Sequence, residues 1–258
     1  MNFFIFMLGA AVGSFLNVCI YRMPRVESII FPGSHCPYCN NKISWHDNIP
    51  LISYILLRAR CRHCNVKIPL KYFFVELLTA ALFLFLFNCY GLSVKFLIYV
   101  LFTSLLLIAT FVDIRYRIIP DEVSLGGIIL GLILSCIFPQ TQNVDYHFQG
   151  LAFSFAGAIC GAAITYLTGL AGSFIFKKEA MGFGDVKLMA AIGAFLGWKL
   201  TLLAFFIAPF FGSFFGIIVL IRKKSHLIPY GPFLSLGALI SLLYGERILS
   251  AIFWTQYM

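Results

Sequence analysis

The chain has 258 residues, of which 61% are hydrophobic and only 11% are charged, and its mean hydropathy is +0.93. A soluble domain carries about 25% charged residues, so the composition excludes that class and predicts a polytopic membrane protein. The formal net charge is +9. Attraction to anionic membrane lipids accounts for this excess. We therefore expect no nucleic-acid partner, although a basic loop that grips nucleic acid is the less favoured alternative.

Eight segments are apolar enough to cross a membrane when about 20 residues are taken as one crossing. They cover residues 2–21, 72–90, 94–112, 122–139, 149–176, 186–198, 200–221 and 232–253. We predict an all-α polytopic membrane fold with about eight transmembrane helices and a small loop domain between the first two. The domains are then a first helix (1–21), a loop domain (22–71) and a seven-helix membrane domain (72–258). We find no convincing internal repeat.

The basic residues are distributed unevenly between the two sides of these spans. One side holds 16 of the 19, namely Arg22, Arg25, Lys42, Arg58, Arg60, Arg62, Lys67, Lys71, Arg115, Arg117, Lys177, Lys178, Lys187, Arg222, Lys223 and Lys224. The other side holds Lys95, Lys199 and Arg247. The positive-inside rule places the richer side, and with it the 22–71 loop, in the cytoplasm. Both termini are then expected outside.

Two cysteine pairs of equal spacing lie in the 22–71 loop, Cys36-Pro-Tyr-Cys39 and Cys61-Arg-His-Cys64. Four thiolates in this pattern predict one tetrahedral Zn²⁺ site, which lets a loop with little core fold around the metal. Disulfides are the alternative, but the cytoplasm is reducing. His35 and His63 lie beside the pairs as alternative ligands. The remaining cysteines fall in apolar spans and are expected to be small buried hydrophobes.

Two aspartates lie at the edges of apolar segments, Asp113 after Phe111-Val112 and Asp185 in Gly182-Phe-Gly184-Asp185. A carboxylate at mid-bilayer costs roughly 2.5–3.5 kcal/mol, so acids in membrane proteins cluster where they are paired, wetted or used. Gly182 and Gly184 permit close backbone approach, as a peptide substrate lying against the motif would require. Asp113 alone fits a salt-bridge partner as well as a catalytic group, but two converging acids predict acid/base chemistry.

A third acid, Asp121, follows Pro120 and precedes Glu122 at the start of the fourth predicted helix. Proline lacks an amide donor and suits a first helical turn, and acids favour the positive N-terminal end of a helix. We therefore interpret Asp121 as a helix-start residue rather than a catalyst.

Taken together, these motifs resemble the type IV prepilin peptidases, which are membrane aspartic proteases of the Gly-x-Gly-Asp kind. The matching segments are 13–24, 44–50, 113–121, 182–190 and 228–233. Ala59 stands where the family usually has Gly, which puts only a turn in doubt. The resemblance identifies Asp113 and Asp185 as the catalytic pair, with Gly182 and Gly184 as active-site backbone.

The resemblance also implies a substrate and a second activity. The substrates would be type IV prepilins or type II secretion pseudopilins, whose short basic leader is removed after a Gly on the cytoplasmic side of the bacterial inner membrane. The new N-terminal residue would then be methylated with S-adenosylmethionine. The sequence contains no Gly-rich dinucleotide-type loop that would hold this donor.

Two carboxyls a few ångströms apart share one proton, so one can activate water while the other donates to the scissile carbonyl. Two other classes remain open. One is an ion- or proton-coupled transporter that uses Asp113 and Asp185, but such sites usually lie near mid-membrane. The other is a membrane-tethered scaffold whose zinc module binds a partner, which leaves the Gly-Phe-Gly-Asp motif without a role.

Overall fold

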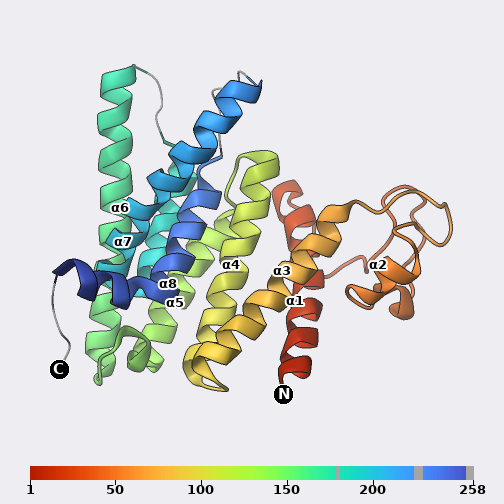
Figure 1. Cartoon of the computed structure of the whole chain (residues 1–258), viewed down its shortest axis with the longest axis horizontal. Helices are drawn as coiled ribbons and strands as arrows, with labels where there is room; N and C mark the ends of the chain where they lie inside the picture. Colours follow the sequence, from red (N-terminus) through yellow and green to blue (C-terminus); the bar gives the residue numbers. More distant parts are fainter. Residues whose placement is uncertain (178–180, 224–228, 254–258) are drawn as a thin grey trace. The chain divides into compact units, whose positions relative to one another are not determined.

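The computed structural model describes residues 1–177, 181–223 and 229–253, which are almost entirely helical (Figure 1). The long helices are α1 (Asn2–Arg22), α3 (Leu70–Tyr90), α4 (Val94–Tyr116), α5 (Asp121–Ile137), α6 (His147–Phe176), α7 (Phe183–Lys223) and α8 (Gly231–Phe253). A short helix, α2 (Ile52–Leu56), lies in the loop between α1 and α3. The described residues form no strand beyond two isolated bridges, which confirms the predicted all-α class.

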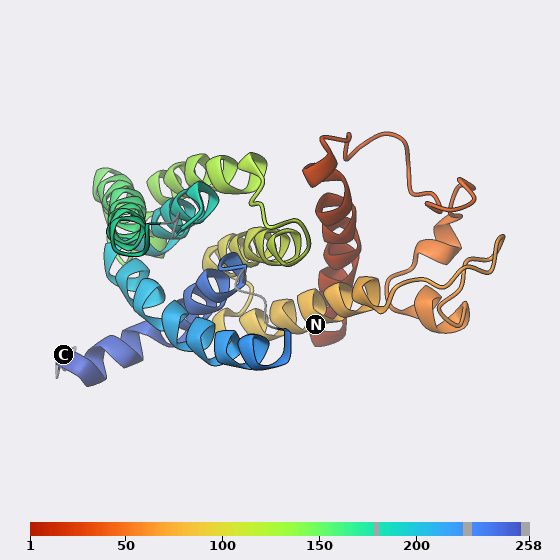
Figure 2. The ribbon, with the colours of Figure 1, turned by 90° about the horizontal axis from the view of Figure 1, so that it is seen from above.

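The chain divides into two compact units, Met1–Ile108 and Ala109–Met258. In the first unit α1 packs against α3 through small residues (Figure 2). A Cβ added to Gly9 would lie 2.8 Å from the Cα of Ala80, and one added to Gly13 would lie 2.7 Å from the Cα of Glu76. Glycine at these positions therefore allows the two backbones to approach closely, as is common between membrane helices. The predicted domain division stays a prediction.

The loop between α1 and α3 is anchored to the ends of both helices. The buried guanidinium of Arg22 donates hydrogen bonds to the carbonyls of Ser28 (2.9 Å) and Pro32 (2.7 Å). The carboxylate of Glu76 accepts a hydrogen bond of 2.8 Å from the Leu51 N–H. Both charged side chains act on backbone groups that would otherwise lack partners near the membrane.

In the second unit α6 crosses α7 at a contact between two glycines. A Cβ on Gly157 would overlap the backbone of Gly193, and a Cβ on Gly193 would overlap the backbone of Gly157. The first part of α7 therefore lies directly against α6 without an intervening side chain.

Helix α7 is interrupted at Gly197, whose φ of 73° and ψ of 169° are not helical. Asp185 and Gly212 lie on opposite sides of this residue, yet both are near Tyr230. The charge of Asp185 acts on Tyr230, and a Cβ at Gly212 would lie 3.5 Å from the Tyr230 ring. A straight helix would separate these two positions by about 40 Å. The chain therefore reverses direction at Gly197, as the sixth and seventh predicted spans require.

Polar side chains from neighbouring helices satisfy the carbonyls that this reversal leaves without helical partners. The Ala194 carbonyl accepts hydrogen bonds from the hydroxyls of Ser154 (2.6 Å) and Ser135 (3.3 Å). The Phe195 carbonyl accepts one of 3.0 Å from the Gln142 side-chain amide. Because hydrocarbon offers no hydrogen bonds, a break in a membrane helix is tolerated only where such partners exist.

Within the described residues, six helices are long and apolar enough to cross a membrane: α1, α3, α4, α6, α7 and α8. Helix α5 has 17 residues, the lower end of the range for a crossing. Eight crossings stay a prediction, in which α5 and the second of the two oppositely directed segments of α7 would add to these six helices.

Candidate active site

Asp113 lies in the last turn of α4, where its side chain is only 6% exposed. The helix ends as Arg117 adopts a left-handed backbone with φ of 56°, and the Arg117 N–H donates to the Asp113 carbonyl at 2.9 Å. The Asp113 carboxylate oxygen Oδ2 accepts a hydrogen bond of 2.9 Å from the N–H of Gly231. This donor is the first residue of α8, so the contact uses an amide that the helix itself leaves unpaired.

Gly231 has no room for a side chain. An added Cβ would lie 2.8 Å from Oδ2 of Asp113 and 3.2 Å from its Cγ. Any larger residue at this position would therefore push the carboxylate away from the α8 amide.

Asp185 lies in the first turn of α7, and its N–H donates a hydrogen bond of 3.1 Å to the Gly182 carbonyl. Its carboxylate is thus near the positive end of a helix, where negative charge is favoured. Gly184 sits close to the segment between α4 and α5, since its added Cβ would lie 3.3 Å from the Cβ of Ile119. Gly182 is exposed, and among the described residues its added Cβ would meet only the Asp185 carboxylate, at 3.4 Å.

The two predicted aspartates are brought to one site where α4 ends and α7 and α8 begin. The charge of Asp113 acts on Asp185, and the charge of Asp185 acts on Tyr230, the residue before Gly231. Burial and then the Asp185 charge raise the pKa of the Tyr230 phenol to about 12. Within the described residues the two carboxylates make no hydrogen bond with each other. Two nearby acids in a partly buried site suit shared-proton chemistry.

Asp121 is the first residue of α5, which confirms its interpretation as a helix-start residue. Its side chain is 61% exposed and forms an ion pair of 2.7 Å with the Lys187 ammonium. This pair joins the start of α5 to the first turns of α7.

The four loop cysteines form a second site. All are free thiols, and their sulfur atoms lie within 4.8 Å of one another. The Cys36 and Cys64 sulfurs are 3.8 Å apart, which equals the spacing of about 3.8 Å expected between thiolates on a tetrahedral zinc with 2.3 Å bonds. The amides of Cys64 and His63 lower the pKa of the Cys61 thiol to about 6, whereas at Cys64 the Val66 amide is outweighed by desolvation and the other cysteines, which raise the pKa of the thiol to about 12. The cluster is compatible with a structural metal, and it includes neither His35 nor His63.

Each cysteine pair is held by the same kind of turn. In the first turn the Cys36 N–H donates to the Asn41 carbonyl and the Asn40 N–H donates to the Cys36 carbonyl. In the second the Cys61 N–H donates to the Val66 carbonyl and the Asn65 N–H donates to the Cys61 carbonyl. Asn40 and Asn65 both adopt a left-handed φ of 55°, which asparagine tolerates better than most residues.

This duplication corrects our expectation that the chain contains no repeat. Both turns read Cys-x-x-Cys-Asn-x-Lys, in residues 36–42 and 61–67. The Asn and Lys that follow each cysteine pair, Asn40 and Lys42 in the first turn and Asn65 and Lys67 in the second, are the sequence signal that reveals this short repeat. The unit is too short to stand out from composition alone, because only four positions are shared.

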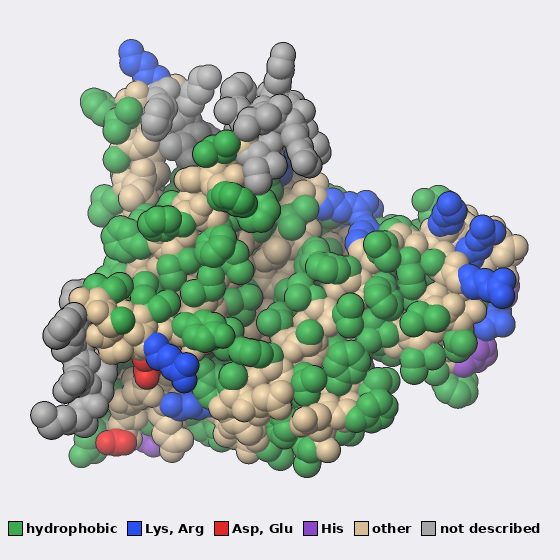
Figure 3. Space-filling model, viewed as in Figure 1, with side chains coloured by type: hydrophobic (Ala, Val, Ile, Leu, Met, Phe, Trp, Pro, Cys, Tyr) green, Lys and Arg blue, Asp and Glu red, His purple; other side chains and the backbone are tan. Residues whose placement is uncertain are grey.

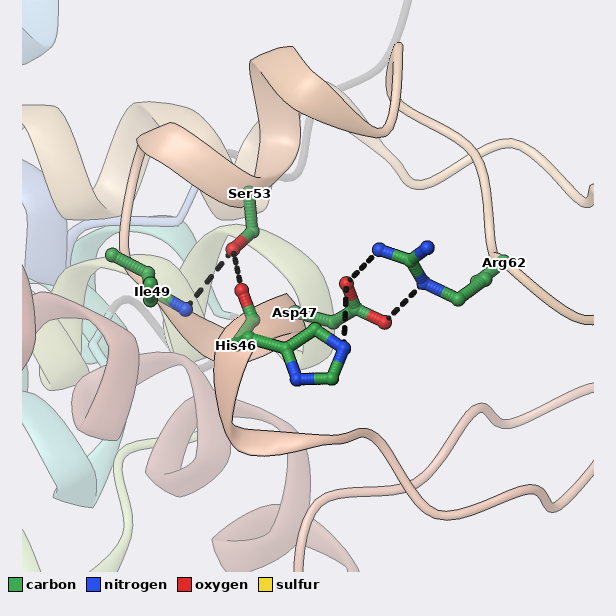
Figure 4. A network of polar contacts seen from close by, with 5 residues as sticks. All are labelled: His46, Asp47, Ile49, Ser53 and Arg62. Carbon is green, nitrogen blue, oxygen red and sulfur yellow. Dashed lines mark hydrogen bonds and ion pairs between the residues drawn. The ribbon is translucent and has the colours of Figure 1, made fainter.

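An ion pair links the second cysteine turn to the turn that precedes α2 (Figure 4). The Arg62 guanidinium contacts Asp47 through two hydrogen bonds, Nε to Oδ2 at 2.7 Å and Nη2 to Oδ1 at 2.6 Å. The Ser53 hydroxyl donates to the His46 carbonyl at 3.0 Å and accepts from the Ile49 N–H at 3.1 Å. The cysteine cluster and the Trp45–Asn48 turn are thereby connected through Arg62, the residue after Cys61, and Asp47.

Comparison with known proteins agrees with this architecture. Residues 7–90 match the bacterial peptidase A24 N-terminal domain, and residues 100–217 match the type IV leader peptidase family. A prepilin leader peptidase/N-methyltransferase of Aeromonas hydrophila is 32% identical over an alignment that covers 95% of this chain and 91% of that protein. The chain belongs to the type IV leader peptidase family.

Two further relatives carry the same name. The one from Pseudomonas aeruginosa is 32% identical over 94% of this chain and 90% of its own length. The one from Myxococcus xanthus is 37% identical over 84% of this chain, but the match spans only 63% of that protein. No solved structure matches the chain. As a leader peptidase with these apolar helices, the protein is a multi-pass protein of the inner membrane.

Two contacts of this leader peptidase could not be found by the sequence reasoning. The Gly231 amide and the Tyr230 ring lie in a segment that the sequence marks only as a family match. The signal was Tyr-Gly-Pro directly before an apolar run, which predicts a helix start but not which side chain it faces. Ile228 of this segment and two of the basic residues used for orientation, Lys178 and Lys224, lie outside the described residues.

Proposed function

We propose that Asp113 and Asp185 are the catalytic pair of a peptidase that removes the leader of type IV prepilins or type II secretion pseudopilins. The relatives are named prepilin leader peptidase/N-methyltransferase, and we assign both activities to this chain. The observation that carries the proposal is electrostatic: acids from the ends of α4 and α7 lie near enough for the charge of one to act on the other.

The reaction follows from one proton shared between the two carboxyls. The ionised carboxyl takes a proton from water as the water oxygen attacks the carbonyl carbon of the scissile bond. The protonated carboxyl donates its proton to the carbonyl oxygen. When the tetrahedral intermediate breaks its C–N bond, the protonated carboxyl gives its proton to the departing amine. The ionised carboxyl takes a proton from a hydroxyl of the intermediate as the C=O bond forms again, so the pair ends with one shared proton, as it began.

Backbone groups around the pair give it its geometry. The Gly231 amide orients Asp113, and the exposed Gly182 and half-buried Gly184 add no side chain that would cover the Asp185 turn from an extended peptide. A substrate that lies along these glycines places its scissile carbonyl between the carboxylates. Such positioning supplies a large part of a catalytic effect.

Zn²⁺ is the metal that best fits the four-cysteine cluster. Four thiolates and no open coordination position are typical of structural zinc sites rather than catalytic ones. Cys36, Cys39, Cys61 and Cys64 would hold the ion. We assign it the folding of the loop between α1 and α3 and no part in hydrolysis.

S-adenosylmethionine is the methyl donor implied by the relatives' name. The described loop contains a hollow lined by Arg58, Arg60 and Arg62. Three guanidinium groups would oppose the sulfonium cation of this donor, so the hollow does not fit it.

We infer that the aspartate side of the membrane domain faces the cytoplasm and that both termini lie outside. Arg115 and Lys187 share the aspartate side, while Asn143 and Glu246 hydrogen-bond at the opposite end of the second unit. The excess of basic residues on the first side supports this orientation and the attraction to anionic lipids. A membrane-impermeant thiol label should reach a cysteine introduced at Asn143 from outside; failure to do so would reverse the assignment.

The direct test is cleavage of a purified prepilin by the purified chain in detergent. We expect a shortened pilin whose new N-terminus follows a Gly, as read by mass spectrometry. A prepilin that remains intact with folded enzyme would reject the peptidase proposal.

A further inference from the structure

A hollow of about 570 Å³ lies in the loop between α1 and α3, and no step of the proposed hydrolysis uses it. Its walls are Leu56 at the end of α2, the next residue Leu57, three arginines (Arg58, Arg60 and Arg62) and two residues of the second cysteine turn, Cys61 and Asn65. It therefore combines an apolar edge with a concentrated positive charge.

The hollow forms where the chain leaves α2 through two consecutive residues of left-handed backbone. Arg58 has φ of 50° and Ala59 has φ of 55°. The turn is closed by hydrogen bonds from the Ala59 N–H to the Tyr54 carbonyl (2.8 Å) and from the Arg60 N–H to the Leu57 carbonyl (3.0 Å). Left-handed backbone is unfavourable for residues with a side chain and is often found at ligand sites.

Two of the three arginines are available to a ligand. Arg62 is bound to Asp47. Arg58 and Arg60 are exposed, and within the described residues their side chains make no hydrogen bond or ion pair. The 22–71 loop has only two acids, Glu27 and Asp47, so its other negative groups are the thiolates of the cysteine cluster, which Cys61 brings to the wall of the hollow. Exposed guanidinium groups of this kind bind phosphate through paired N–H donors.

The surface beside these arginines is apolar. The side chains of Ile55 and Leu56 are 66% and 75% exposed, and Trp45 on the neighbouring turn is 82% exposed. Figure 3 shows Lys and Arg side chains gathered on this loop among hydrophobic ones. The loop begins and ends at membrane helices, so it stays near the bilayer surface.

We propose that this hollow binds the phosphate headgroup of an anionic phospholipid, with Arg58 and Arg60 on the phosphate and Ile55 and Leu56 in the acyl-chain boundary. A phospholipid would contact both the arginines, through its phosphate, and the exposed apolar side chains, through its acyl chains. A free anion would contact only the arginines. The proposal does not depend on the peptidase activity.

The test uses the full chain in a maltoside detergent with Trp45 as its single tryptophan, after Trp198→Phe and Trp254→Phe substitution. Trp45 fluorescence is recorded while dihexanoyl phosphatidylglycerol, dihexanoyl phosphatidylcholine or inorganic phosphate is added. We expect saturable binding of phosphatidylglycerol at least tenfold tighter than that of the other two. Equal binding of phosphate would overturn the lipid assignment, and equal binding of phosphatidylcholine would overturn the role of charge.

Matched variants locate the site. Arg58→Gln with Arg60→Gln should weaken phosphatidylglycerol binding roughly tenfold or more, because two charge-assisted contacts are lost. Lys42→Gln with Lys67→Gln removes the same charge from the same loop outside the hollow and should change binding less than twofold. Equal weakening in both variants would show diffuse attraction and overturn the site.

A second readout separates ligand binding from support of the metal cluster. Zinc content is measured for every variant, since the arginines also flank the cysteines. Leu56→Asn leaves all charges in place and changes an exposed side chain, so we expect full zinc content and phosphatidylglycerol binding weakened about threefold. Unchanged lipid affinity in this variant would overturn the acyl-chain contact.

Discussion

The cysteine cluster is assembled from two short turns, whereas the aspartate site joins the ends of three helices. Each cysteine turn is closed by hydrogen bonds within six residues. The aspartate site instead needs the last turn of α4, the first turn of α7 and the first amide of α8. The first kind of site can form wherever its loop folds, but the second exists only when α4, α7 and α8 are packed together.

The strongest test of this difference is the catalytic pair. Asp113→Asn or Asp185→Asn keeps the size of the side chain but removes the titratable group, so prepilin cleavage should fall by several orders of magnitude. The double variant should lose little more than either single variant, because the two residues act as a unit. Initial rates of cleavage by the purified variants provide the measurement.

Asp121→Asn is the matched control for this pair. It removes a carboxylate that is 61% exposed and paired with Lys187 at the start of a helix, and such pairs contribute little. Substantial activity should therefore remain. Near-normal cleavage by either Asp113→Asn or Asp185→Asn would reject the pair, provided that expression and thermal stability match those of the wild type.

Gly231→Ala should show that the long-range contact matters for chemistry. The new Cβ would lie 2.8 Å from Oδ2 of Asp113, and displacement of a catalytic group by about 1 Å can cost roughly 10²-fold. We expect kcat to fall by that order while KM changes little. Gly126→Ala is the control, because no atom lies within 4 Å of its added Cβ. Equal kcat in the two variants would remove the positioning role of Gly231.

The cysteine cluster should respond independently of the aspartates. Cys36→Ser with Cys39→Ser removes two of four ligands, so bound zinc should fall from about one per chain to almost none. Because the loop supplies no group that acts on the scissile carbonyl, cleavage should fall less than tenfold. Elemental analysis and cleavage rates give both numbers. Full metal content would contradict the assignment, and loss of cleavage equal to that of Asp113→Asn would show that the two regions are not separable.

The same contrast explains what the sequence could predict. Spacing alone predicts the four cysteines because their ligand geometry is local, and hydropathy predicts the eight membrane segments because hydrocarbon requires apolar length. The contact between Gly231 and Asp113 depends on how α8 packs against α4, which no local pattern encodes. The boundary between the predicted spans 186–198 and 200–221 lies close to the reversal at Gly197. The side chains that donate hydrogen bonds to the carbonyls before it, Ser135, Ser154 and Gln142, come from other elements and could not be predicted from this segment.

The smallest predicted effect concerns Ala59, which stands where the resemblance to the family implies Gly. Ala59 has φ of 55°, and left-handed backbone costs an L-residue about 1–2 kcal/mol. Ala59→Gly removes that cost but gives up about 0.5–1 kcal/mol through a more flexible unfolded loop. We therefore expect a net stabilisation of the loop by about 0.5–1 kcal/mol, seen as zinc release at a higher temperature. Asn65→Gly is the matched control, because asparagine already tolerates its φ of 55° and should gain less. Zinc release from Ala59→Gly at a lower temperature than from the wild type would contradict this prediction. It would mean that the Ala59 methyl group stabilises the loop by more than its left-handed backbone destabilises it.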